Sequence, residues 1–147
     1  YRNAVENDLP ALVQMLADDD LGDKREDSSM PLDSKYIDAF SSIRSDPNNE
    51  LIVVCCDDFI VGMLQLTFIP YLTYRGSWRC LVEGVRVHSK HRGHGLGKKL
   101  FEWAISRAQE KNCRLIQLTS DKTRADALRF YESLGFLASH EGFKLHL

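Results

Sequence analysis

Hydrophobic residues along the chain follow two spacings, one typical of strands and one typical of helices. Two apolar runs, LIVVCC (51–56) and IVGMLQLTF (60–68), flank Asp57 and Asp58, a pattern that predicts an antiparallel hairpin. Further strands are predicted at 1–5, 78–88 and 114–120, and the closing stretch FLASHEGFKLHL (136–147) predicts one or two more.

Apolar positions three or four residues apart predict four helices between these strands. The first begins at Asp8, which with Pro10 caps its start, and ends at about Ala17. The second is capped by Asp33 or Ser34. The third spans about 95–111, and the fourth, within ADALRFYESL, ends at Gly135. The pattern as a whole predicts a single α+β domain over residues 1–147, with a mixed sheet flanked by about four helices.

The composition fits one globular domain, since 147 residues with 44% hydrophobic and 27% charged content can form a sizeable core. No apolar run approaches the roughly 20 residues that a membrane span needs, and the first residues lack the layout of a signal peptide. The four cysteines have neither the spacing of a zinc site nor that of a redox pair, so we expect all four to be reduced. These features predict a soluble, cytoplasmic protein without a membrane partner.

The formal net charge of −2 conceals two segments of opposite charge. Residues 75–114 hold ten Lys or Arg against three Glu, whereas residues 18–33 hold seven acids against two bases. Such segments suit a site for one anionic and one cationic ligand, but they would also arise from two solvated faces.

The segment HRGHGLGKKL (91–100) lies between a predicted strand and a predicted helix. Unpaired N–H groups at the start of a helix point into such a loop and bind anions. Glycines at 93, 95 and 97 would let a bulky anion approach the backbone. Lys98 and Lys99 oppose the helix dipole in the first turn, a cost that an anionic ligand would offset. The segment therefore predicts a phosphate-binding loop, with a solvated basic turn as the alternative.

Spacing separates this segment from two common phosphate-binding motifs. A P-loop would need glycine at Arg92 and a hydroxyl residue at Lys99, so that motif is excluded. A dinucleotide fingerprint would place its third glycine at Lys98 or Leu100. Asp121 could still imitate the ribose-binding acid of that motif, which leaves it as a weaker alternative.

Two other patterns fit. Arg/Gln-x-x-Gly-x-Gly/Ala is met at 92–97, directly after Val-x-Val at 85–87, and Tyr-x-x-x-Gly-Phe is met at 131–136. With both signatures in this order, each in its expected context of strand and helix, the chain resembles the GNAT superfamily of acyl-CoA-dependent N-acetyltransferases. The resemblance spans nearly the whole chain and implies a GNAT-like fold with a mixed, mostly antiparallel central sheet. The C-terminal half also resembles aminoalkylphosphonate acetyltransferases, a likeness that rests on the superfamily motifs and does not assign a substrate.

The resemblance implies acetyl-CoA as the acyl donor. Val85 and Val87 would present backbone groups to the pantetheine arm as an extra strand would. Arg124 stands where family members often have Asn, and an arginine could still reach a phosphate. The residues that would hold the pyrophosphate are Arg92, Gly93, His94, Gly95, Leu96, Gly97 and Lys98.

Two side chains are candidates for the chemistry. Glu83, on the strand that would carry the cofactor, could accept the proton of the attacking amine, and Gly84 suggests a bulge that re-aims it. By resemblance, Tyr131 would protonate the departing thiolate, and a backbone N–H near Val85 would meet the oxyanion. The alternatives are a surface glutamate and a tyrosine that only packs in the core.

Other ligands are less well supported. His88, His91 and His94 recur every third residue but cross a strand end and a glycine turn with no carboxylate nearby, so no metal site is expected. Nucleic acid is not expected either, because the basic residues cluster on a glycine turn and the total charge is negative.

The function implied by the resemblance is direct transfer of an acetyl group from acetyl-CoA to a primary amine of a small molecule, in a ternary complex. A homodimer is compatible with it. By the same resemblance the acidic connection at 18–33 would line the acceptor cleft, which favours a cationic acceptor. The alternative is a non-catalytic acyl-CoA sensor or regulatory domain of the same fold.

Overall fold

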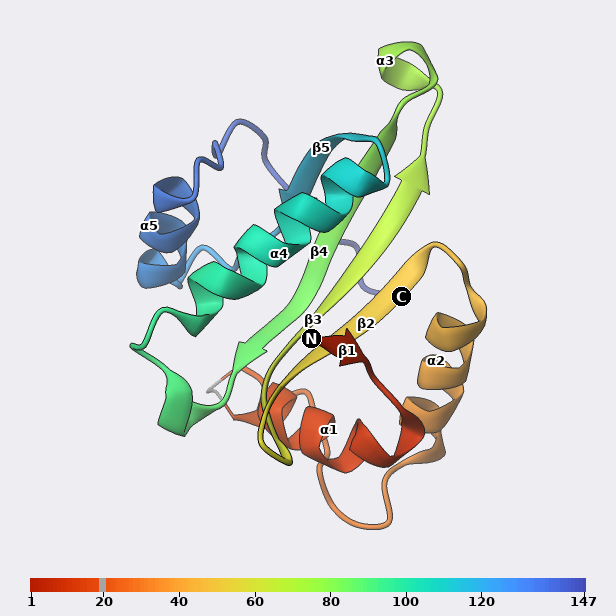
Figure 1. Cartoon of the computed structure of the whole chain (residues 1–147), viewed down its shortest axis with the longest axis vertical. Coiled ribbons are helices and arrows are strands. Elements are labelled where there is room, and N and C mark those ends of the chain that lie inside the picture. The colour runs from red at the N-terminus through yellow and green to blue at the C-terminus, as the bar shows by residue number, and fades with distance from the viewer. Residues whose placement is uncertain (19–20) are drawn as a thin grey trace.

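One mixed sheet forms the centre of the protein (Figure 1). The computed structural model describes residues 1–18 and 21–147, so Asp19 and Asp20 of the acidic connection lie outside the described residues. Within the described chain the sheet has five strands in the order β1-β2-β3-β4-β5. They are β1 Arg2–Asn3, β2 Asn49–Cys56, β3 Phe59–Pro70, β4 Trp78–Val87 and β5 Cys113–Leu118. Neighbours are antiparallel except β4 and β5, which confirms a mixed, mostly antiparallel sheet.

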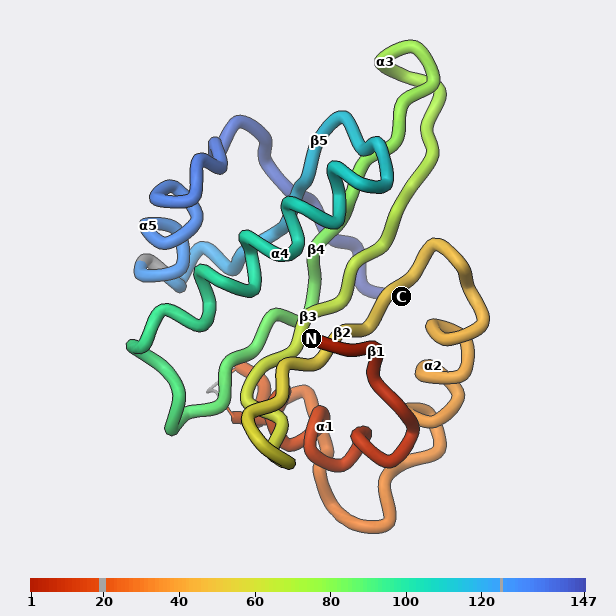
Figure 2. Tube along the Cα trace, in the orientation of Figure 1, coloured from red at the N-terminus to blue at the C-terminus, as the bar shows by residue number. Residues whose placement is uncertain are grey.

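The four predicted helices are all present, as α1 Leu9–Ala17, α2 Ser34–Ser45, α4 Leu96–Glu110 and α5 Ala125–Ser133. Three short elements were not predicted, namely η1 Glu6–Asp8, α3 Thr73–Gly76 and η2 Ser89–His91. The α3 turn forms the tip of the β3–β4 hairpin, which projects beyond the rest of the sheet (Figure 2). No helix in the described parts of the chain is both long enough and apolar enough to cross a membrane.

The main core lies between the sheet and α4. Leu64 and Leu66 of β3 are fully buried against Leu100 and Phe101 of α4. Small residues on the same stripe of α4, such as Ala104, let the helix approach the sheet closely. Residues of α5 pack on the edge of this core, so α4 and α5 share one face of the sheet.

A second core covers the opposite face, where α1 and α2 pack on β2 and β3. Leu12 of α1 and Phe40 of α2 lie against Val53 and Met63, which alternate along their strands with residues of the main core. Burial on both faces explains why β2 and β3 read as continuous apolar runs. The four cysteines are all free thiols, as expected.

The two predicted N-caps behave differently. Asp33 caps α2 as expected, because its carboxylate accepts a hydrogen bond from the N–H of Lys35 at 2.9 Å. Asp8 is the N-cap of α1 with Pro10 in the first turn, as expected, but its carboxylate makes no capping hydrogen bond. The carboxylate instead binds both terminal nitrogens of Arg2, at 2.6 and 3.0 Å, and the N–H of Val5. A guanidinium that binds both oxygens is a stronger partner than a helix N–H, and it holds the pKa of Asp8 below its usual range.

The prediction of one or two closing strands within residues 136–147 is wrong. Residues 136–147 contain no strand or helix, and Phe143 and Leu145 are 93% and 85% exposed. Apolar alternation favours a strand only where a sheet edge lies within reach, and no strand in the described chain pairs with this segment. An ion pair between Lys122 and Glu141, at 2.9 Å, connects the segment to the loop that follows β5.

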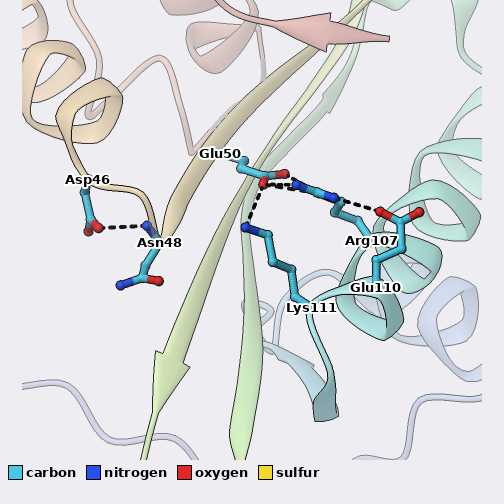
Figure 3. A network of polar contacts seen from close by, with 6 residues as sticks. All are labelled: Asp46, Asn48, Glu50, Arg107, Glu110 and Lys111. Carbon is cyan, nitrogen blue, oxygen red and sulfur yellow. Dashed lines mark hydrogen bonds and ion pairs between the residues drawn. The ribbon is translucent and has the colours of Figure 1, made fainter.

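Helix α4 is fixed to the sheet by charge as well as by the core (Figure 3). The guanidinium of Arg107 binds Glu50 of β2 with nitrogen–oxygen distances of 2.7 to 3.2 Å, and it also binds Glu110 at 2.7 Å. Lys111 adds a longer contact to Glu50, at 3.6 Å. Because Glu50 is largely buried, this fork-shaped pair restricts how α4 can lie across the sheet.

Candidate active site

The pairing of β4 with β5 stops well before β4 ends. Val82 lies opposite Leu118, the last residue of β5, but β4 continues to Val87. In the part of the chain that the structure describes, residues 83–87 therefore have β3 on one side and no strand on the other. The two strands leave an open backbone edge at this end of β4.

A bulge interrupts β4 at the start of this open edge. Gln65 pairs with Glu83 and Met63 with Arg86, so one residue of β3 faces two residues of β4. Gly84 is the first of those two and has φ +58°, in the left-handed region that favours glycine. The bulge expected from the sequence is confirmed.

The bulge changes which side chains face α4. Val82 is buried in the main core, so Glu83 points to the opposite face and is exposed. One extra residue reverses the alternation, which returns Val85 and Val87 to the α4 face, where they pack on the main core. Arg86 then shares the opposite face with Glu83.

The backbone of Val85 and Val87 points to the open edge. The N–H of His88 donates to Val61 of β3 at 3.0 Å, so the residues that alternate with His88 face away from β3. Their carbonyls accept hydrogen bonds from two guanidinium groups, that of Arg86 at Val85 and that of Arg92 at Val87, each at 3.0 Å. Arginine side chains thus lie where a neighbouring strand would bind. Arg86 was not among the site residues predicted from the sequence. A charged residue between the two valines of the Val-x-Val pattern could have indicated it.

The glycine loop begins directly after this edge and ends at the start of α4. Gly93 and Gly95 have φ of +78° and +77°, and a Cβ added at either would meet no atom within 4 Å. Gly95 is the N-cap of α4 and has no side chain that could cap the helix, so the first-turn N–H groups face the loop. Gly97 differs, because an added Cβ would lie 3.5 Å from the ring of Phe130. That distance is an ordinary van der Waals contact, so Gly97 lies where α4 packs against Phe130 of α5.

The other predicted loop residues lie around this turn. Leu96 packs partly on the main core. Lys98 is mostly exposed, with a long contact of 3.8 Å to Glu102. His94 binds the carbonyl of Arg92 through Nδ1, and Nδ1 of His88 accepts from the N–H of Lys90 at 3.3 Å. No group of three or more potential metal ligands gathers in the described residues.

Tyr131 lies on α5 in a cluster of aromatic rings. Its ring packs against Phe101 of α4 at 5.5 Å and against Phe136 at 6.2 Å between centroids. Burial raises the pKa of its hydroxyl above the usual 10.0, while the positive charges of Arg124 and Arg86 oppose that rise. Arg124 stands immediately before α5. The hydroxyl is therefore protonated at neutral pH and within electrostatic range of both arginines.

Two cysteines on β4 and β5 are held as thiols. Cys80 is fully buried, and burial raises the pKa of its thiol to about 12. Burial also raises the pKa of the Cys113 thiol. A thiol with a raised pKa is a poor nucleophile at neutral pH.

Comparison with known proteins identifies a family and a similar structure. The profile described as "Acetyltransferase (GNAT) family" matches residues 11–136. A crystal structure described as a transcriptional regulator from Bacillus halodurans C-125 is 62% identical, with a TM-score of 0.96, and the match covers 99% of this chain and 97% of that one.

Two characterised enzymes are more distant. N-alpha-acetyltransferase 30 of Saccharomyces cerevisiae is 39% identical over 87 residues, which are 59% of this chain and 48% of the yeast protein. The match thus spans about half of that relative. Aminoalkylphosphonate N-acetyltransferase of Salmonella typhimurium is 28% identical over 108 residues, which are 74% of this chain and 70% of that enzyme.

The bulge generates a test of stability. Gly84→Ala should lower the free energy of unfolding by about 1–2 kcal/mol, because a residue with a Cβ is disfavoured at φ +58°. Crowding contributes little, since the nearest atom to an added Cβ is Met63 Cε at 3.9 Å. Chemical denaturation of this variant and of the control Gly142→Ala, at an exposed glycine without positive φ, measures the difference. If Gly84→Ala and Gly142→Ala have the same free energy of unfolding, the left-handed conformation at residue 84 does not require glycine.

Proposed function

The chain belongs to the acetyltransferase (GNAT) family, and from that premise we propose that residues 1–147 form one catalytic domain that transfers the acetyl group of acetyl-CoA to a primary amine of a small molecule. The observation that carries the proposal is the open edge of β4 followed, after the glycine loop, by a helix start whose N-cap has no side chain. An elongated ligand whose amide-bearing arm is joined to a pyrophosphate matches both features, since the edge binds amide groups and the helix start binds phosphate.

The pantetheine arm of the donor would lie along β4 and lead to the glycine loop. Its pantetheine amides would bind the backbone of Val85 and Val87, as an added strand would. Its pyrophosphate would bind the loop of residues 92–98, where the left-handed Gly93 and Gly95 leave the backbone accessible. Arg124 lies within electrostatic range of the Tyr131 hydroxyl and adds positive charge beside that proposed proton donor.

The proposed reaction is a direct transfer. The amine nitrogen attacks the thioester carbonyl carbon, the new C–N bond forms, and the C–S bond breaks. Glu83 accepts the amine proton, directly or through water, and Tyr131 donates its proton to the departing sulfur. A backbone N–H near Val85 stabilises the oxyanion. Glu83 is exposed on one face of β4 and Tyr131 packs with the helices of the other face, so the acceptor and the donor sulfur would approach from different sides.

The two cysteines of β4 and β5 support transfer without a covalent acetyl-enzyme. Cys80 is buried with a pKa of about 12, and Cys113 is also shifted toward the thiol form. A nucleophile that carries acetyl would need an accessible thiolate. A ternary complex of enzyme, acetyl-CoA and amine is therefore the proposed reacting state.

The acceptor class rests on charge. Glu26 and Asp27 belong to the acidic connection within the described residues, and a cationic amine would be attracted to it. The aminoalkylphosphonate named for the Salmonella relative and the α-nitrogen named for the yeast relative are different acceptors. Both belong with the cationic amines in any substrate screen.

A second candidate function is a non-catalytic acyl-CoA sensor. One finding favours it, which is the description of the 62% identical Bacillus halodurans structure as a transcriptional regulator. The same donor site would serve a sensor, and the chemistry assigned to Glu83 and Tyr131 would then be absent. Turnover separates the two functions.

Donor binding gives the first functional test. Acetyl-CoA should raise the melting temperature of the protein by binding its folded state, by the equivalent of about 2.7 kcal/mol at a hundred times the Kd, and NAD should not. Gly95→Val should remove the shift, because the new side chain would project into the loop at φ +77°. Gly142→Val is the matched control and should keep the shift. Stabilisation by NAD equal to that by acetyl-CoA would contradict the assignment.

The catalytic role of Tyr131 gives the second functional test. Tyr131→Phe should lower kcat about a hundredfold, as expected for loss of a general acid, and change the Kd of acetyl-CoA less than about threefold. Since burial raises the Tyr131 pKa above 10.0, the wild-type enzyme should not lose its proton donor below about pH 10. Tyr74→Phe removes a hydroxyl from the exposed hairpin tip and should leave kcat unchanged. If both variants keep wild-type kcat at every pH, Tyr131 only packs in the core.

A further inference from the structure

The side chain of Arg92 connects two distant parts of the chain. Its Nε donates to the carbonyl of Val87 at 3.0 Å. Its Nη2 donates to Asp18 twice, to the backbone carbonyl at 3.1 Å and to carboxylate Oδ2 at 2.8 Å. Arg92 thus joins the open end of β4 to the residue that follows α1, 74 positions earlier in the sequence.

These contacts connect the first residue of the glycine loop to β4 and to the end of α1. Arg92 is the first residue of the loop, and its bond to Val87 turns the side chain back toward the strand that the loop leaves. Asp18, from a different element, binds Nη2 of the same guanidinium. A planar guanidinium with two partners in this arrangement has a fixed orientation, which a lysine could not reproduce.

We propose that Asp18 is a positioning residue of the pyrophosphate-binding loop and acts through Arg92. This inference rests on the proposed function, because it assigns the loop to acetyl-CoA. In it, the Arg92 side chain sets the position of the loop backbone, and the first-turn N–H groups of α4 supply the anion contacts. Asp18 itself touches neither substrate.

The exposure of the pair indicates where the effect should be seen. The Arg92 and Asp18 side chains are 49% and 43% exposed, and such pairs add little to global stability. A change at Asp18 should therefore leave the melting temperature of the free protein nearly unchanged and alter the affinity for acetyl-CoA. A residue with a purely structural role would change the two quantities together.

The sign of the affinity change distinguishes positioning from competition. If Asp18 positions Arg92, Asp18→Ala should weaken acetyl-CoA binding about tenfold. If instead Asp18 holds back an arginine that would otherwise bind phosphate, the same change should tighten binding. Simple loss of a negative charge near an anionic ligand would also tighten it.

The experiment measures the Kd of acetyl-CoA by calorimetry for the full chain. The expected results are a Kd about tenfold higher for Asp18→Ala, a smaller rise for Asp18→Asn, whose amide oxygen can still accept from Arg92, and no further loss when Asp18→Ala is added to Arg92→Ala. The control Asp23→Ala removes the same charge from an exposed position in the same connection and should change Kd less than twofold.

Each other outcome is decisive. Unchanged or tighter binding by Asp18→Ala, or equal weakening by Asp23→Ala, would overturn the inference while leaving the proposed function intact. Additive losses in the double variant would also overturn it, since Asp18 would then act independently of Arg92. If wild-type protein binds no acetyl-CoA, the proposed function itself is wrong, and the inference falls with it.

Discussion

The extra residue at Gly84 is the constraint on which the arrangement of the site depends. A regular strand would send Val85 and Val87 to the face opposite Val82. The bulge instead places all three on the α4 face and leaves Glu83 and Arg86 on the other. It occurs just beyond the last residue that pairs with β5, so the reversal coincides with the point where β4 loses its neighbour. The open edge of β4 therefore has the valine side chains on its α4 face and the charged side chains of Glu83 and Arg86 on its other face.

Helix α4 connects this edge to the rest of the fold. Its first turn closes the glycine loop, its middle fills the main core through Leu100 and Phe101, and its end is held to β2 by Arg107 and Glu50. The aromatic cluster around Phe101 also positions α5 and thereby Tyr131. The anion-binding turn and the candidate proton donor thus share one rigid support, which suits a reaction that requires both ends of a long donor to be held.

Local sequence patterns predicted the parts of the structure that depend on neighbours in the chain. The β2–β3 hairpin, the four main helices, the cap at Asp33 and the bulge at Gly84 all follow from residues within a few positions. Contacts between distant residues were not accessible in this way. Asp8 matched a capping position, but Arg2 competes for its carboxylate, and the segment 136–147 has strand alternation without a strand to pair with. The contact of Arg92 with Asp18 and the position of Arg86 at the open edge likewise depend on how separate elements meet.

The central claim is that the open edge of β4 and its loop hold a donor for acetyl transfer to an amine. The most direct measurement is release of free CoA from acetyl-CoA by the wild-type protein, with a panel of amines that includes polyamines, an aminoalkylphosphonate and a peptide with a free N-terminus. We expect CoA release that depends on the amine, exceeds the rate without amine and matches the amount of N-acetylated product. Tight binding of acetyl-CoA with no amine-dependent release across the whole panel would contradict it and would favour the sensor.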